Sequence, residues 1–356
     1  MLKNNWLETR KNFEAWWRHE GCVIGSWRPI CPSATPPERP SPLPRDTDYK
    51  HPLVRAKGTL QDLQTQVFPG DTLPLFETDI GAGSLALYLG CHATIGPDTV
   101  WYEPLFETAE DPTIIPPLHF DPQNLWWQIT ERLILEGKHL PHDDALFGIP
   151  ALCDGLDVLS SLRGGQPLLM DLLEQPDWVV SKLDEIYLVW QECFERLYQM
   201  TSAPDGSSSY GAFRLWAPGR VTLLQCDASV MISPEMFESF GMPYLRDQCT
   251  KIPFTMFHVD GTQALVHLDA ILSLEGLKAV EWSPQAGIEP PGDPRWYELY
   301  KRILASGRSL QVCGVKGHEI IPLFDAIGAK GVYVIAEFES ETEAEMILKK
   351  SEPYRK

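Results

Sequence analysis

The second half of the chain alternates short apolar runs with segments typical of helices. The apolar runs span residues 221–227, 252–261, 277–284, 309–315 and 331–338, and a helical segment follows each of them. Strands that are apolar along their whole length and joined by helices are typical of parallel sheets covered on both faces. This alternation constrains the chain to the α/β class more strongly than any other feature of the sequence.

Three further apolar runs, residues 21–27, 71–79 and 145–152, raise the number of predicted strands to eight. Helices are predicted over residues 121–137 and 168–200. Eight strand–helix units fit a length of 356 residues if they close into one (β/α)8 TIM barrel. A doubly wound open sheet is the alternative, but no glycine-rich phosphate loop follows the first predicted strand. We therefore expect the barrel.

The first 60 residues differ from the rest of the chain. Residues 29–53 are rich in proline and have no periodicity, which predicts an extended loop. We expect residues 1–60 to form a helix, the first strand and this Pro-rich loop, which packs on the barrel as an active-site cover or an oligomer arm. Residues 61–356 are expected to form the remainder of a single barrel domain.

The charge balance excludes some partners. The chain has 30 Lys and Arg residues against 49 Asp and Glu, a net charge of −19. Nucleic acids and anionic membranes need a basic face, so neither is expected as the main partner. The sequence has no apolar signal core, no apolar run of 18 residues and no CxxC pair among its eight cysteines. These features predict a soluble, cytoplasmic protein with reduced thiols.

Polar residues stand at the ends of the last five predicted strands. Those residues are Asp227, His258 with Asp260, Glu281, Cys313 and Glu337. Active sites of α/β barrels lie at the carboxyl ends of the strands, so these side chains are expected to converge on one rim. For each of them a helix cap or a loop clamp is the alternative role.

The residue types at this rim are those of a metal site. In a strand, residues i and i+2 face the same side, so His258 and Asp260 can both point to one ion. Imidazole, carboxylate and thiolate are zinc ligands, and three protein ligands with an open position are typical of catalytic zinc. The predicted ligands are His258, Asp260, Glu281 and Glu337, with Cys313 as a further candidate. The alternative for His258 is a neutral imidazole that bonds to Asp260 or to a backbone carbonyl.

Other residues are expected to act on the substrate. Asp227 is expected to orient the substrate or act as an acid or base together with His258, and Asp79 is the further catalytic candidate. An aromatic-rich mouth suits a flat or apolar ligand, and arginines suit an anion. The predicted substrate-binding residues are Trp216, Trp282, Arg28 and Arg163. Core packing or ion pairing is the alternative for each.

Three segments, residues 224–245, 257–284 and 312–324, together resemble the uroporphyrinogen decarboxylase superfamily. They read LQCDASVMISPEMFESFGMPYL, FHVDGTQALVHLDAILSLEGLKAVEWSP and VCGVKGHEIIPLF. Residues 154–179 are similar to the matching middle segment of such proteins. The resemblance covers residues 60–350 loosely and 215–340 best, and it implies a (β/α)8 barrel.

Two branches of this superfamily differ in their motifs. The decarboxylating branch has an N-terminal Met-Arg-Gln-Ala-Gly-Arg segment, which this chain lacks although it has Arg28. The zinc-dependent methyltransferase branch has a His-x-Cys pair and a later Cys, and some members add a Glu. Here His258 and Glu281 match, while Asp260 and Ala336-Glu337 stand at the two Cys positions. The sequence is therefore closer to the methyltransferase branch.

The resemblance implies a metal-dependent methyltransferase that moves a methyl group between a corrinoid or small methyl donor and a thiol. Zinc or another divalent ion is the implied cofactor, and the partners are a small-molecule substrate and a corrinoid protein. A homodimer is one assembly that such a chain could form. The alternatives are a metal-free decarboxylase acting on uroporphyrinogen or another carboxylate, and a barrel that binds a tetrapyrrole or corrinoid without chemistry.

Overall fold

The computed structural model describes residues 2–27, 30, 49–96, 100–153 and 155–355. Its largest sheet has six strands, and every neighbouring pair in it is parallel. The order across this sheet is β1 (Val23–Ser26), β12 (Val332–Glu337), β11 (Ser309–Lys316), β10 (Ala279–Ser283), β9 (Phe254–Asp260) and β8 (Val221–Leu224). Five of these strands are the apolar runs of the second half, so the predicted α/β class is confirmed.

A second sheet contains four strands. Its order is β2 (Leu75–Phe76), β5 (Leu146–Ile149), β6 (Ser208–Tyr210) and β7 (Leu215–Ala217). The first three strands run parallel, whereas β6 and β7 form an antiparallel hairpin. The sequence analysis did not predict this hairpin, nor the separate antiparallel pair β3 (His92–Ile95) and β4 (Val100–Glu103).

The two larger sheets meet at both of their edges without a shared ladder. On one side, the Asp71 backbone N–H donates to the Ile24 carbonyl at 2.7 Å, and the Ser26 N–H donates to Thr72 Oγ1 at 2.8 Å. On the other side, Ser208 Oγ donates to the Gly219 carbonyl at 2.6 Å. Each of the eight predicted runs contains a strand, but these eight strands are divided between the two larger sheets, and the described residues form no closed barrel.

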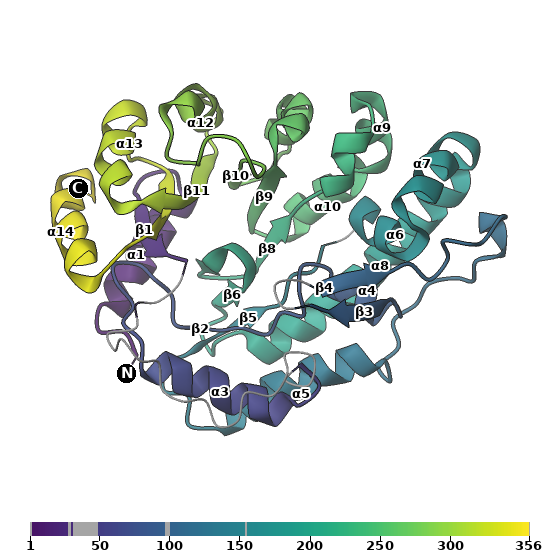
Figure 1. Ribbon diagram of the computed structural model, residues 1–356, viewed down its shortest axis with the longest axis horizontal. Coiled ribbons are helices and arrows are strands. Elements are labelled where there is room, and N and C mark those ends of the chain that lie inside the picture. The colour runs from purple at the N-terminus through teal and green to yellow at the C-terminus, as the bar shows by residue number, and fades with distance from the viewer. Residues whose placement is uncertain (1, 28–29, 31–48, 97–99, 154, 356) are drawn as a thin grey trace.

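Helices lie outside the strands in Figure 1, with α9, α12, α13 and α14 along the six-stranded sheet and α3 and α5 below the second sheet. Their bounds are α1 (Trp6–Trp17), α3 (Pro52–Gln64), α4 (Ser84–Tyr88), α5 (Leu125–His139), α6 (Gly155–Arg163), α7 (Gly165–Glu174), α8 (Pro176–Thr201), α9 (Pro234–Phe240), α10 (Met242–Lys251), α11 (Leu268–Leu272), α12 (Tyr297–Ala305), α13 (Ile320–Ile327) and α14 (Glu341–Ser351). Short 3-10 turns extend several of them, including η3 (Asp227–Met231) and η4 (Thr262–His267).

The long helix predicted over residues 168–200 is two helices. The break falls at Gln175, where φ is −135° and ψ is 49°. Proline has no backbone N–H and clashes with the preceding turn, so Pro176 begins α8 instead of continuing α7. Serines cap two of the helices: Ser233 Oγ accepts from the Met236 N–H at the start of α9, and Ser340 Oγ accepts from the Glu343 N–H at the start of α14.

The N-terminal helix packs into the same core as the strands. Phe13 and Trp16 of α1 are fully buried against Tyr333 of β12, with ring centroids 5.2 and 5.4 Å from the tyrosine ring. Residues 31–48, most of the predicted Pro-rich loop, lie outside the described residues. Among the helices that the structure describes, none has both the length and the apolar character needed to cross a membrane.

Candidate functional site

His258 and Glu281 face each other on neighbouring strands. They are register partners in the parallel ladder between β9 and β10, which places their side chains on the same face of the sheet. His258 Nδ1 is hydrogen-bonded to Glu281 Oε2, and Ser283 Oγ donates to Glu281 Oε1 at 2.8 Å. His258 is 9% exposed and Glu281 is fully buried. The carboxylate therefore occupies Nδ1 and holds one edge of the imidazole.

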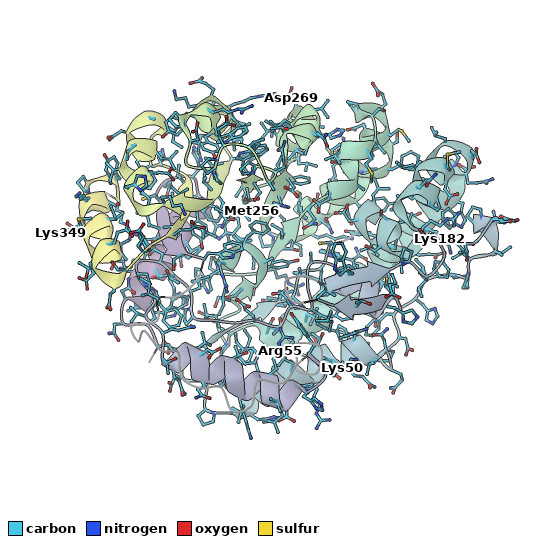
Figure 2. All side chains as sticks on the ribbon, viewed as in Figure 1. Lys50, Arg55, Lys182, Met256, Asp269 and Lys349 are labelled. Atoms are coloured by element: carbon cyan, nitrogen blue, oxygen red, sulfur yellow. The ribbon has the colours of Figure 1, made fainter. Side chains whose placement is uncertain are left out.

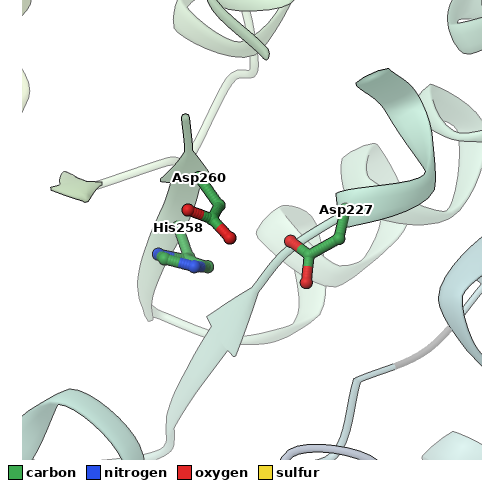
Figure 3. A group of neighbouring side chains, drawn as sticks. All are labelled: Asp227, His258 and Asp260. Atoms are coloured by element: carbon green, nitrogen blue, oxygen red, sulfur yellow. The ribbon is translucent and has the colours of Figure 1, made fainter. Parts of the chain in front are cut away.

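Two exposed aspartates lie beside this histidine. Asp260 is the last residue of β9, two positions after His258 and on the same face, and Asp227 opens η3 directly after β8. One donor atom from each of the three side chains lies within 4.8 Å of the other two (Figure 3). Within the described residues this is the one such group of His, Cys, Asp or Glu. The sequence analysis predicted that strand ends would bring these three residues together, and the structure does so.

Crowded negative charge shifts the protonation of the site. Burial is the largest single effect on His258, and it lowers the pKa of the imidazole. The charge and hydrogen bond of Glu281, together with the charges of Asp227 and Asp260, outweigh burial and raise this pKa to about 9. Burial and the neighbouring carboxylate of Asp157 raise the pKa of Asp227 to about 7, although the His258 charge acts in the opposite direction. At neutral pH the free site therefore holds a protonated imidazole and a carboxyl group poised to exchange a proton.

Asp157 belongs to the site and was missed from the sequence. It lies in the first turn of α6, and its carboxylate accepts the backbone N–H groups of Asp227 at 3.0 Å and Ala228 at 2.8 Å. Gln225 Nε2 bridges the two aspartates, 3.0 Å from Asp227 Oδ2 and 3.4 Å from Asp157 Oδ2. Asp157 thus holds the turn that carries Asp227. A search of strand ends overlooks it because it lies on a helix.

The tip of the β6–β7 hairpin contacts the histidine. The Phe213 ring lies 4.6 Å from the His258 ring, centroid to centroid, at an interplanar angle of 39°. Phe213 and Arg214 both have left-handed backbone conformations, with φ of 57° and 51°. Each such residue costs about 1–3 kcal/mol and persists only where its surroundings enforce the conformation. Such strain next to a titratable cluster is typical of functional sites.

Asp79 lies against the same hairpin and outside the three-residue cluster. Its carboxylate accepts the Ala151 backbone N–H, and its Oδ2 would lie 2.3 Å from a Cβ atom at Gly211. Only glycine fits at position 211 for this reason. Burial raises the pKa of Asp79 to about 6. The catalytic role predicted for Asp79 stays a prediction, and its carboxylate contacts the Ala151 N–H after β5 and lies against the hairpin at Gly211.

Both predicted pocket tryptophans are fully buried, and this corrects their expected position. Trp216 of β7 packs between Trp6 and Phe13 of α1, with ring centroids 5.6 and 6.2 Å away. Trp282 packs on Trp296, 5.0 Å between centroids. Trp282 follows Glu281 directly in β10, so strand alternation points it to the opposite face of the sheet. Neither side chain has surface available to a substrate.

Of the two predicted anion-binding arginines, the structure describes Arg163, which is engaged in other contacts. Arg163 is 4% exposed, and its Nε donates to Asp171 Oδ2 at 2.7 Å while its Nη1 donates to the Phe106 carbonyl. These contacts join α6 to α7 and leave its charge compensated. Arg28 lies outside the described residues.

Two predicted ligands lie apart from the three-residue group. Glu337, at the end of β12, is exposed and forms an ion pair with Lys316. Cys313 Sγ lies 3.7 Å from Gln311 Oε1 on its own strand, and burial together with Glu281 raises the pKa of this thiol well above its usual range. Glu281 itself is the hydrogen-bond partner of His258 and is not one of the three clustered donors.

A hollow of about 680 Å³ lies at the opposite ends of the strands. Phe254 begins β9, and Lys278 and Arg308 directly precede β10 and β11. Its cations have structural partners: Arg308 Nη2 donates to the Leu272 and Leu274 carbonyls at the end of α11, at 3.3 and 3.1 Å. Cations at helix C-termini compensate the helix dipole. The hollow lies at the amino ends of the strands, whereas the acidic cluster lies at their carboxyl ends.

The cluster fits a divalent ion. Ligands of a tetrahedral ion with bonds of about 2.1 Å lie about 3.4 Å apart, so small side-chain rotations bring donors that are within 4.8 Å to that spacing. One imidazole and two carboxylates form an oxygen-rich donor set that suits zinc or a harder divalent ion. A histidine ligand typically donates its second ring N–H to a carboxylate, and Glu281 provides that partner here.

Comparison with solved structures shows a likeness in fold. No protein-family model matches the chain, and no curated protein matches it. A solved structure of a methyltransferase from Methanosarcina mazei is similar, with a TM-score of 0.60 over 96% of this chain and 97% of that chain. The two sequences are 13% identical. At this identity the likeness shows a shared fold.

Proposed function

We propose that the chain is a metal-dependent methyltransferase that moves a methyl group from a corrinoid or small methyl donor to a thiol. The observation that carries the proposal is the placement of His258, Asp227 and Asp260 around one point, with Glu281 behind the histidine. The fold shared with a methyltransferase supports the same reaction class. The implied ion is zinc or another divalent cation, and the implied partner is a corrinoid protein.

A bound divalent ion would lower the pKa of a thiol so that its thiolate forms near neutral pH. His258, Asp227 and Asp260 would hold the ion, and Glu281 would keep the imidazole oriented. In the transfer, the sulfur–carbon bond forms as the cobalt–carbon bond of a corrinoid donor breaks, and the electron pair stays on cobalt. The thiol proton leaves to a base. Solvent water would accept this proton, because Asp227 would be engaged as a ligand of the ion.

The same proposal includes a more specific fold, in which the two sheets are parts of one (β/α)8 barrel and one domain. The contacts of Asp71 with Ile24 and of Ser208 with Gly219 support this view, because they join the sheets at both edges. In a barrel the carboxyl ends of all strands form one rim, where the acidic cluster lies. Homodimer formation remains part of the proposal.

A metal-free decarboxylase is the second candidate, and one observation favours it. Asp227 with a pKa near 7 lies beside a protonated His258, and such a pair can deliver a proton to a carbanion after CO2 leaves. This reaction requires a substrate carboxylate and no ion. Turnover in the presence of a chelator separates it from methyl transfer.

The test is an assay of zinc-loaded protein with methylcobalamin and a panel of small thiols. Loss of the methylcobalamin absorbance and formation of the thioether report transfer. We expect turnover by the wild type and by the control Glu337→Gln, whose exposed carboxylate lies outside the cluster, and none by His258→Ala. Absence of transfer to every thiol, together with chelator-resistant release of CO2 from a carboxylate substrate, would establish the decarboxylase instead.

A further inference from the structure

We infer that Phe213, at the tip of the β6–β7 hairpin, is a positioning residue that fixes the imidazole of His258 for metal binding. This inference rests on the proposed metal site and extends it to a residue from the second sheet. Glu281 holds one edge of the imidazole through Nδ1, whereas the Phe213 ring lies against its face at 4.6 Å. An edge contact and a face contact together define the orientation of a ring, and one of them alone does not.

The strained backbone of the tip needs an explanation that packing alone does not supply. Phe213 (φ 57°, ψ 17°) is followed by Arg214 (φ 51°), two successive non-glycine residues in the left-handed region. A chain selected only for stability would place glycine or asparagine at such positions. Phe213 instead brings a large ring to the one histidine of the acidic cluster. Strain at a ligand site typically accompanies preorganisation.

Buried groups of the six-stranded sheet hold this conformation. Gln311 of β11 is fully buried, and its Nε2 donates to the Phe213 carbonyl at 2.8 Å. Tyr333 of β12 is 1% exposed, and its hydroxyl donates to the Arg214 carbonyl at 3.0 Å. These two bonds fasten consecutive carbonyls of the tip to rigid strands. The hairpin therefore cannot relax without leaving buried polar groups unpaired.

Contacts on the outer side of the tip limit its movement further. The Phe213 ring meets Trp27 edge to face with centroids 5.8 Å apart, and Arg214 pairs with Glu77 Oε1 at 2.5 Å. Phe213 is thus held between an exposed indole and the buried imidazole. The arrangement predicts that loss of the ring frees His258 to rotate about the bond to its Cβ atom, with little effect on the rest of the core.

The experiment titrates the metal-free protein with Co2+ and follows the visible d–d bands, which report the geometry of the ion as well as its affinity. Phe213→Leu should weaken Co2+ binding about 10-fold or more, as loss of an outer-shell partner does, and should alter the band shape. Phe213→Tyr keeps the ring and should behave as the wild type. Gln311→Met, which removes the bond to the Phe213 carbonyl, should shift affinity in the same direction by less.

A matched control removes a ring elsewhere. Phe324 of α13 is 1% exposed and contacts Tyr354, so Phe324→Leu should leave the cobalt spectrum unchanged. Equal affinities and spectra for wild type and Phe213→Leu would overturn the positioning role. If the wild type binds no Co2+, the proposed metal function fails, and NMR of the metal-free protein then decides on Phe213. A sharp downfield Nδ1–H resonance of His258 that broadens in Phe213→Leu supports positioning, and an unchanged one refutes it.

Discussion

The two ends of the six-stranded sheet carry side chains of opposite charge, and these charges differ in their contacts. At the amino ends of β9 to β11, Arg18, Lys278 and Arg308 border a hollow, and Arg308 bonds to the carbonyls that end α11. At the carboxyl ends of β8 to β10, Asp227, Asp260 and Glu281 surround a single histidine. Figure 2 shows the described side chains as sticks on the ribbon of the strands and helices.

This difference distinguishes charged side chains that are paired within the fold from charged side chains that are available to a ligand. At the amino ends, Arg308 donates to the Leu272 and Leu274 carbonyls and Arg18 pairs with Glu20, so these two cations already have partners in the fold. The acids at the carboxyl ends repel one another. Burial and the Asp157 carboxylate raise the pKa of Asp227 to about 7, and Glu281 with the two aspartates raises the pKa of His258 to about 9 against the opposing effect of burial. A divalent cation would relieve that repulsion. The proposed cation site therefore lies at the carboxyl ends, and substitutions at the two ends should differ in their effects on metal binding.

The largest effect is expected from loss of the one nitrogen ligand. His258→Ala removes a donor from the three-residue group, so Zn2+ affinity should fall about 1000-fold, more than the 10–100-fold typical of an outer-shell partner. Competition with a chromophoric chelator measures this affinity. A fall of less than tenfold would show that His258 is not a ligand and would remove the distinction between the two ends.

In the metal-free protein, the contribution of His258 to the free energy of unfolding is expected to fall as pH rises. In ordinary acid denaturation, stability is lost as pH falls. The pKa of His258 is raised to about 9, above its ordinary value, so its stabilising contribution is complete below about pH 6.5 and is lost as pH rises through 9. The contribution is on the order of 3 kcal/mol. Urea unfolding of wild type and Glu281→Gln at pH 6 and pH 9.5 measures it. The variant should lose most of the difference, and an identical pH dependence in both would contradict the assignment.

Truncation at the amino ends should affect stability and leave metal binding intact. Arg308→Met removes the bonds to the Leu272 and Leu274 carbonyls, so the free energy of unfolding should fall by about 1–3 kcal/mol. Zn2+ affinity should stay within twofold of the wild type. Thermal and urea unfolding, with the same chelator competition, provide both readouts. A large loss of Zn2+ affinity would mean that the two ends are coupled.

The smallest effect is expected for Glu337. Its carboxylate pairs with Lys316, and both side chains are about half exposed, so Glu337→Gln should change the free energy of unfolding by about 0.5 kcal/mol or less. Zn2+ affinity should not change, because Glu337 is not among the clustered donors. Calorimetric titration with Zn2+ checks this. A marked loss of affinity would restore Glu337 as a ligand.

Much of this site follows from the sequence because strand register is local. His258 and Asp260 share a face by the two-residue period, and the strand after them brings Glu281 level with His258. The same period could have excluded Trp282, since it follows Glu281 and must face the opposite side. The α/β class followed in the same way from uninterrupted apolar runs.

The remainder depends on contacts between distant segments. Asp157 acts through backbone N–H groups 70 and 71 positions away, and no local pattern marks it. Phe213 reaches His258 only because the unpredicted β6–β7 hairpin folds toward the sheet, although the short alternating segment SSSYGAFRLWA with a glycine at its turn is a hairpin signal. The role of Glu281 as a partner of the imidazole depends on side-chain geometry that spacing does not determine.

Elemental analysis tests the central claim most directly. Wild type and the double variant His258→Ala/Glu281→Ala are incubated with excess zinc, freed of unbound metal and analysed for bound ions, with circular dichroism to confirm that both are folded. The site as described predicts about one ion per chain in the wild type and none in the variant. No bound ion in the wild type, or equal amounts in the two proteins, would contradict it.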